Sequence, residues 1–280
     1  MKRAVALVSA ILGACTSPAA HGGDPFEIQV YDGTANAPGV LGVELHLNDW
    51  ATGNRAATPP EAALHGQAHA TLEPSFGVMP FWEVGAYLQS AVRTDDGVVD
   101  WAGAKLRSKF VTPPSWNAHV RLGANLELSY LPSTYDRARW GMELRPIAAW
   151  HDDDWLLVVN PILDQPFAGS DAKDGPSFEP AVKLARTVGP VALGIEYYAT
   201  LGPLSALRPW RDEQQQIFEV IDFLRLGDIE LNVGAGEGLT AASEGLVFKA
   251  IVGYAFDATR PAGIREGEYS PMSHSGLTAK

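Results

Sequence analysis

Residues 119–131 read HVRLGANLELSYL, and this stretch decides the fold. Across it every second residue is apolar, and the residues in between are polar or glycine, which is the pattern of a β-strand with two different faces. The run is longer than a typical strand of a soluble protein, and its polar face carries Arg121, Asn125 and Glu127. A strand with lipid on one side and a polar lumen on the other must alternate over this whole length.

The same alternation recurs along the chain, in runs at 41–48, 68–78, 82–89, 102–110, 142–145, 191–198, 229–233 and 248–256. Weaker runs near 154–164, 176–187 and 214–224 bring the count to about twelve strands. The last of these, QQQIFEVIDFL, also fits an amphipathic helix with Ile217, Val220 and Leu224 on one side. The sequence therefore predicts an all-β protein, an antiparallel up-and-down transmembrane β-barrel of about 12 strands over residues 40–256.

The links between these runs alternate in length. Long links, such as 49–65 and 164–177, alternate with tight turns at Met79-Pro80, HDDD (151–154) and TVGP (187–190). Outer-membrane barrels have an even number of strands, short periplasmic turns and longer outer loops. Since the chain begins and ends on the short side, we expect both termini in the periplasm.

Charge and hydropathy exclude two function classes. The formal net charge is −12, and no basic stripe is present that would displace counterions from a nucleic acid. No stretch after the N-terminus approaches the roughly 18 consecutive apolar residues of a transmembrane helix.

The N-terminus predicts export. Lys2 and Arg3 precede a short apolar stretch, 4–14, as in a secretory signal peptide, which we place at residues 1–20. Leu12-Gly13-Ala14-Cys15 resembles the lipobox of bacterial lipoproteins, so Cys15, the only cysteine, is a candidate for lipidation. Ordinary cleavage after Ala19 or Ala20 is the alternative, and both stay open. We expect residues 21–39 to form an N-terminal periplasmic segment and 257–280 a disordered tail.

Soluble folds also alternate apolar and polar residues. In a periplasmic β-sandwich or a lipocalin-like binding protein the apolar set faces the core and the polar set faces water. Three features favour the membrane barrel: small and aliphatic apolar faces, polar faces that mix Glu with Arg or Lys, and aromatic residues near strand ends. These aromatic residues are Trp50, Trp82, Tyr130, Trp140, Trp150, Trp155 and Phe256.

Several segments resemble a known family. FEIQVYDGTANAPG, VELHLN, LEPSFGV, WAGAKLRSKFVTPP, GPSFEPAVK and GIEYY resemble uncharacterised proteobacterial outer-membrane barrel proteins, which are loosely similar to transporter barrels of the MetA-pathway phenol-degradation type. The resemblance covers about residues 25–256. It implies outer-membrane lipid and the barrel-insertion machinery as partners, but no ligand residues. One departure is that IVGYAF (251–256), which resembles the terminal assembly signal, is followed by 257–280.

The sequence offers little sign of catalysis. It contains no G-x-S-x-G motif, and Ser273-His274-Ser275 lies in the tail, so we predict that the protein is not an enzyme. GAGEG (234–238) is too isolated to be a phosphate-binding loop. Asp152-Asp153-Asp154 could attract Ca²⁺, although three acids in a tight turn more often form a solvated turn.

Two histidines raise the question of a metal. His46 and His69 lie on polar faces of strands that should pair, with Glu44 and Glu73 nearby, and two histidines with a carboxylate can bind a metal ion. Hydrogen-bonded histidines are the more frequent arrangement, and we expect no metal and no cofactor.

The polar faces carry the predicted function. We expect one lumen to be lined by Glu44, His46, His69, Glu73, Glu83, Arg93, Lys105, Arg107, Lys109, His119, Arg121, Asn125, Glu127, Glu143, Arg145, Glu179, Lys183, Glu196, Glu230 and Lys249. A buried unpaired charge is costly, so most of these should pair. Complete pairing would plug the barrel, and incomplete pairing would leave a narrow pore.

The predicted function is a narrow passive channel for small hydrophilic or aromatic solutes. The first alternative is a closed structural barrel that displays the long loops 49–67 and 165–177 to partners. The second is a periplasmic binding protein, and a surface enzyme is more remote. The sequence does not indicate the solute or the oligomeric state.

Overall fold

The computed structural model describes residues 24–257 apart from residues 54, 56–58, 94–96, 114, 170 and 208. This part of the chain contains twelve strands: β1 (Val40–Trp50), β2 (Gln67–Met79), β3 (Trp82–Arg93), β4 (Val99–Val111), β5 (Val120–Tyr130), β6 (Trp140–His151), β7 (Trp155–Pro166), β8 (Ser177–Val188), β9 (Val191–Thr200), β10 (Gln214–Leu226), β11 (Ile229–Gly238) and β12 (Val247–Asp257). It also contains two short 3₁₀ helices, η1 (Asp171–Lys173) and η2 (Trp210–Asp212). The predicted signal peptide, Cys15 and residues 258–280 lie outside the described residues.

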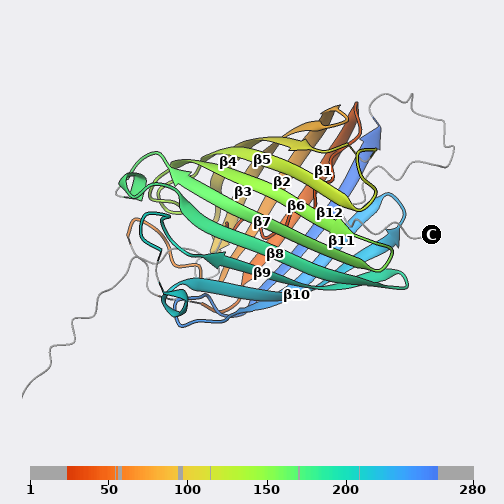
Figure 1. The fold of residues 1–280 in the computed structure, drawn as a ribbon. Coiled ribbons are helices and arrows are strands. Elements are labelled where there is room, and N and C mark those ends of the chain that lie inside the picture. The colour runs from red at the N-terminus through yellow and green to blue at the C-terminus, as the bar shows by residue number, and fades with distance from the viewer. Residues whose placement is uncertain are drawn as a thin grey trace, which may run out of the picture.

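The strands form one closed antiparallel barrel (Figure 1). Each strand pairs with its neighbours in the chain, and β1 pairs with β12 to close the ring, with Leu45 opposite Val252. Closure removes the free edges that an open sheet would expose. The predicted all-β up-and-down barrel with 12 strands is confirmed.

The ambiguous run at 214–224 is strand β10. Both of its edges are paired, with β9 on one side and β11 on the other, so the backbone hydrogen bonds that a helix would make internally are made between strands. No helix within the described residues combines the length and the apolarity needed to cross a bilayer.

The two ends of the barrel differ. At one end, here called the turn end, β2–β3, β6–β7, β8–β9 and β10–β11 are joined through residues 80–81, 152–154, 189–190 and 227–228. At the other, the loop end, most links are long, as in 51–66 and 201–213. One pair departs from the predicted rhythm, because the turn-end link 112–119 is longer than the loop-end link 94–98.

On most strands the apolar set faces outward. On β5, Leu122, Leu126 and Leu128 are exposed, whereas Asn125 and Glu127 between them are buried. The long alternation that decided the fold therefore separates an apolar exterior from a polar interior. A soluble sandwich or a lipocalin-like barrel would have the reverse arrangement, so the structure does not support these alternatives.

Aromatic side chains gather at both ends of the outer wall. Near the loop end the rings of Tyr130 and Trp140 lie 4.7 Å apart, and at the turn end Trp82 stacks on Phe110 at 5.9 Å. Trp50 is a correction to the predicted girdle, because it is almost completely buried and points into the lumen. There its Nε1 donates to the carbonyl of Pro25.

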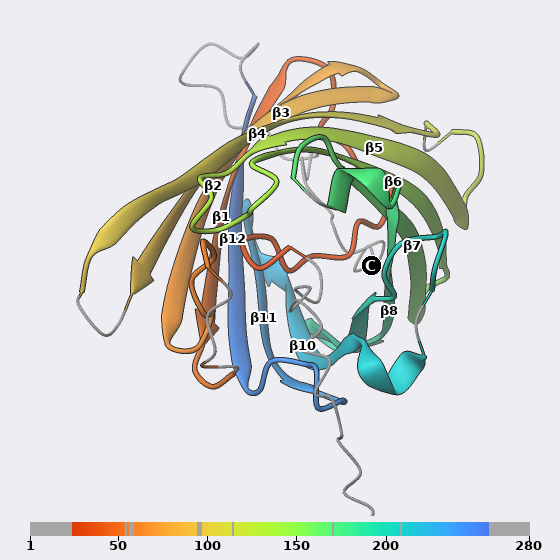
Figure 2. The same ribbon diagram turned by 90° about the vertical axis from the view of Figure 1, so that its left-hand side faces the viewer.

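Residues 24–39, here called the inserted segment, lie inside the barrel (Figure 2). Phe26, Ile28, Val30 and Tyr31 are buried among residues of the inner wall. We expected 21–39 to form a periplasmic segment ahead of the first strand. The described part of it instead crosses the lumen and then continues into β1.

Candidate functional site

The inner wall holds nearly all the side chains that the sequence assigned to a lumen. The buried ones are Glu44, His46, His69, Glu73, Glu83, Lys105, Arg107, Lys109, Asn125, Glu127, Arg145, Lys183, Glu196 and Lys249. Arg93, Arg121, Glu143, Glu179 and Glu230 are partly exposed. Of these, Arg93 lies at the loop end opposite Asp100, with Nε 3.6 Å from the carboxylate.

His119 does not belong to this set. It is exposed and lies just before β5, in the turn-end link, where its Nδ1 is 3.0 Å from the carbonyl oxygen of His151. The strict alternation extends back to His119 in the sequence, but the paired strand begins at Val120.

One chain of ion pairs crosses β1 to β4. Glu73 lies between His46, with Nε2 at 3.1 Å, and Arg107, with Nη2 at 2.6 Å. Arg107 also contacts Glu83 at 2.7 Å, and Lys109 contacts the same carboxylate at 2.9 Å. Gly85 makes this reach possible, because a Cβ there would lie 2.8 Å from Arg107 Nε.

A second cluster lies on β4 to β6. Lys105 Nζ is 2.9 Å from Glu127, whose other oxygen accepts a hydrogen bond of 2.7 Å from Asn125 Nδ2. On β6, Arg145 Nε lies 2.7 Å from Glu143. Each of these basic groups therefore has a carboxylate partner on the wall itself.

A third cluster lies on the opposite side of the barrel. Lys183 on β8 lies 3.2 Å from Glu196 on β9 and 3.0 Å from Asp222 on β10. Lys249 on β12 pairs with the same Glu196, and Asn232 donates to Asp222. Buried charges of the wall are thus mostly paired, as the cost of an unpaired buried charge requires.

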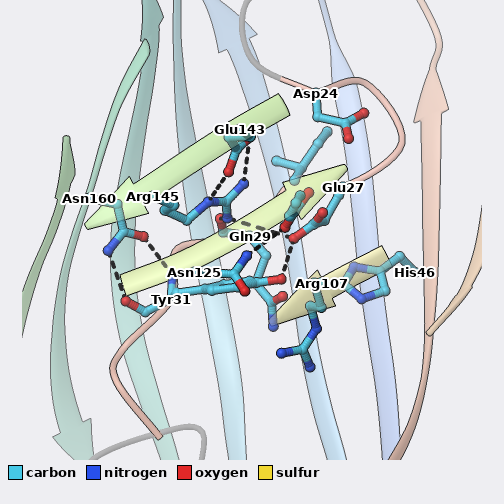
Figure 3. A network of polar contacts seen from close by, with 12 residues as sticks. Asp24, Glu27, Gln29, Tyr31, His46, Arg107, Asn125, Glu143, Arg145 and Asn160 are labelled. Carbon is cyan, nitrogen blue, oxygen red and sulfur yellow. Dashed lines mark hydrogen bonds and ion pairs between the residues drawn. The ribbon is translucent and has the colours of Figure 1, made fainter. Parts of the chain in front are cut away.

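The inserted segment adds acidic groups to the β4–β6 side (Figure 3). Asp24 pairs with Lys105. Glu27 lies 3.7 Å from Lys105 and 3.6 Å from Arg145, and accepts a hydrogen bond of 2.7 Å from the hydroxyl of Tyr31. The segment is therefore bound by charge to a wall whose own charges are already paired.

Asn160 on β7 holds the backbone of the segment at Tyr31. The Tyr31 N–H donates to Asn160 Oδ1 at 2.7 Å, and Asn160 Nδ2 donates to the Tyr31 carbonyl at 2.9 Å. Nearby, Arg145 Nη1 donates to the Gln29 carbonyl at 3.1 Å. Since both Asn160 bonds are to backbone atoms, they fix the position of the segment whatever its side chains are.

The other side of the segment is apolar. Ile28 and Val30 belong to one buried cluster with inward-facing residues of β6 to β10, including Leu156, Val158 and Phe218. Alternate residues of the extended segment therefore face different walls: Glu27 and Tyr31 face the charged wall, and Ile28 and Val30 face the apolar wall. The alternation in FEIQVY (26–31) is the sequence signal for this arrangement, and no prediction above rests on it.

The space left beside the segment is small. A cavity of about 30 Å³ lies next to Gln29–Thr34, between Arg107 on one side and Lys183 and Asp222 on the other. A cavity of this size can hold ordered water. The arrangement can therefore hold water beside the segment.

The candidate metal ligands only partly come together. Ligand atoms of Glu44, His46 and Glu73 all lie within 4.8 Å of one another. His69 does not join them, because its Nδ1 donates to Pro25 O and its Nε2 lies 2.9 Å from Gln67 Oε1. The guanidinium of Arg107 on Glu73 compensates that carboxylate and would repel a cation.

Asp152 has a structural role in its turn. Its Oδ1 accepts the backbone N–H groups of Asp154 and Trp155, at 2.9 and 2.7 Å. These two hydrogen bonds lower the pKa of Asp152. The carboxylate thus closes the β6–β7 turn, which is the solvated-turn interpretation of the three aspartates. The other candidate motif for chemistry, Ser273-His274-Ser275, lies outside the described residues.

Comparison with known proteins gives matches only among solved structures. No family model matches the chain, and no curated protein matches it. The KdgM porin superposes with a TM-score of 0.51 at 9% identity, covering 77% of this chain and 99% of the porin. The COG4313 outer membrane channel from Pseudomonas putida F1 gives 0.49 at 15% identity, covering 84% and 98%, and the NanC porin 0.47 at 9%, covering 77% and 98%.

At these identities the comparison with the KdgM porin establishes the fold alone. The fold that the chain shares with this porin is a closed antiparallel β-barrel. The ion pairs on the inner wall and the segment inside the lumen are features of this chain, and their role follows from its own residues.

Proposed function

We propose that the protein is an outer-membrane channel for small hydrophilic or aromatic solutes, closed in this structure by the inserted segment. The observation that carries the proposal is the division of the barrel wall, with exposed aliphatic side chains outside and paired charges inside. A polar lumen inside an apolar wall is the arrangement of outer-membrane barrels that pass solutes.

The outer wall supports a membrane location. Exposed aliphatic residues occur on every side of the barrel, as in Leu45 on β1, Leu106 on β4, Leu157 on β7 and Ile195 on β9. An apolar surface that surrounds a whole protein is far larger than the patches that soluble monomers expose. With lipid around it, the loop end would face the cell exterior and the turn end the periplasm.

The lumen supports passage rather than catalysis. Its polar groups are mainly arranged as charge pairs spread over the strands, such as Arg107 with Glu83 and Lys183 with Asp222. Such pairs offer a passing solute successive weak contacts, which conduction requires. The aromatic solutes in the proposal come from the resemblance to MetA-pathway transporter barrels and from no contact in the structure.

Conductance of the purified protein in planar bilayers tests the proposal. We expect small conductance steps, and Arg107→Gln should change ion selectivity because it removes a charge from the lumen. Arg137→Gln is the matched control, since Arg137 makes its ion pair with Glu61 in the loops and not in the lumen. Failure of the wild type and of segment-loosening variants such as Asn160→Ala to conduct would contradict the proposal.

A closed structural barrel is the second candidate. The observation in its favour is the packing of the lumen by the inserted segment, which leaves beside it a cavity of about 30 Å³. In that case the loop-end links 51–66 and 167–176 would be the functional surface. Absence of conductance in every variant, together with normal heat-modifiable gel mobility, would favour this candidate.

A further inference from the structure

The start of the inserted segment lies at the loop end. The Pro25 carbonyl accepts hydrogen bonds from Asn48 Nδ2 at 3.2 Å, Trp50 Nε1 at 3.3 Å and His69 Nδ1 at 3.0 Å. Trp50 is the last residue of β1 and precedes the long link 51–66. Residue 25 is therefore held at the level where β1 and β2 enter their loop-end link.

Phe26 confirms this level independently. Its ring stacks on His69 with centroids 4.1 Å apart and meets the edge of Tyr135 at 5.6 Å. Tyr135 belongs to the loop-end link between β5 and β6. Phe26 is thus packed beneath a loop at the loop end of the barrel, and the β2–β3 turn lies at the opposite end.

The end of the segment lies at the turn end. The Asn36 N–H donates to Glu83 at 2.6 Å, and the Gly39 N–H donates to the Gly77 carbonyl at 2.8 Å. Gly77 is close to the β2–β3 turn, and a side chain there would collide with the Ala37 carbonyl. The segment therefore runs the height of the barrel from loop end to turn end and then reverses into β1.

We propose that the N-terminus of the mature protein lies on the loop side of the membrane, so that the inserted segment enters the lumen from the cell surface. This inference rests on the proposed function for its assignment of the loop end to the exterior. It replaces the expectation that the N-terminus is periplasmic.

Wall groups bind the segment where it crosses the lumen. Asn160 and Arg145 hold its backbone, and Ile28 and Val30 belong to a buried cluster that includes Val158.

Thiol labelling in intact cells tests the proposal. The mature protein should carry no free natural thiol, because Cys15 is the only cysteine and is either removed or acylated. Gly22→Cys places a reporter just ahead of the described segment. Asp174→Cys in the loop-end link 167–176 and Asp228→Cys in the turn-end link 227–228 are controls at exposed positions. Heat-modifiable mobility confirms that each variant is folded.

We expect a membrane-impermeant maleimide to label positions 22 and 174 in intact cells and position 228 only after permeabilisation. The proposal would be overturned if position 22, like position 228, were labelled only after permeabilisation. It would also be overturned if position 22 were never labelled while positions 174 and 228 react as expected. If position 228 labels in intact cells and position 174 does not, the proposed orientation fails. The inference about the N-terminus is then decided by whether position 22 follows position 174.

Discussion

Glu27 is the residue on which the charged side of the inserted segment depends. It contacts Lys105, Arg145 and Tyr31, while each of the two basic groups also has its own carboxylate on the wall. Removing Glu27 therefore leaves no unpaired wall charge, and its effect should fall on the position of the segment.

We predict that Glu27→Ala loosens the segment, with a loss of about 1–3 kcal/mol for its hydrogen bonds and charge contacts. The expected result is a higher or more frequent conductance in planar bilayers, while the barrel keeps its heat-modifiable mobility. Glu61→Ala removes a carboxylate of similar pairing in the loops, with Arg137 at 2.7 Å, and serves as the control. Equal conductance of the two variants would contradict the role of Glu27.

Asn160 makes the backbone contact that side-chain charges cannot replace. We predict that Asn160→Ala exposes the segment to protease in detergent, because both Tyr31 backbone groups lose their partner. Asn117→Ala is a matched control, since Asn117 also binds two backbone N–H groups, those of His119 and Val120, but at the turn end outside the lumen. Limited proteolysis followed by mass spectrometry measures the cleavage within residues 24–39.

At the scale of elements, the predictability of a strand depends on what its inner face touches. β5 has lipid-facing leucines and a charged inner face, so its alternation is complete and the sequence predicted it clearly. β7, WLLVVNPILDQP, was a weak prediction because Leu156, Val158 and Ile162 face inward as well. They belong to one buried cluster with Ile28 and Val30, which are distant in the sequence.

The apolar side of the segment gives a prediction of its own. Ile28→Ala should weaken docking of the segment on β7 to β10, by about 2–5 kcal/mol for a buried isoleucine. The strands themselves lose no hydrogen bond, so we expect more proteolysis of residues 24–39 at unchanged barrel mobility. Leu204→Ala, at an exposed position in the loop-end link between β9 and β10, is the control. A global loss of the folded form in Ile28→Ala would argue that the segment is part of the barrel core.

At the scale of the whole molecule, the charge of the lumen sets ion preference. Acidic groups of the wall and the segment outnumber basic ones: Asp24, Glu27, Asp32, Glu44, Glu73, Glu83, Glu127, Glu143, Asp164, Glu179, Glu196, Asp222 and Glu230 stand against Lys105, Arg107, Lys109, Arg121, Arg145, Lys183 and Lys249. We predict preference for cations over anions, measured as the reversal potential in a salt gradient. The preference should weaken at high salt, where charges are screened. A preference for anions would contradict it.

The residues of the inner wall were largely predictable from the sequence, but the position of the inserted segment inside the lumen was not. Residue polarity at alternate positions is enough to assign Glu73, Arg107 or Lys183 to a lumen, because the strand period fixes the face. The inserted segment makes no strand pairing along most of its length, and its position depends on contacts with residues as distant as Asn160 and Lys249. Its alternation alone does not distinguish a strand of the barrel from a chain inside it.

The junction of the segment with β1 constrains the order of events during assembly. The segment is continuous with β1, and β1 is one side of the seam that closes the barrel against β12. Lys249 of β12 also donates to the Ile28 carbonyl, so the last strand contacts both its partner strand and the chain inside. If β1 and β12 paired first, the sixteen residues of the inserted segment would have to enter a closed barrel afterwards. We therefore expect the sheet to form around the inserted segment, with the pairing of β12 to β1 as the last step.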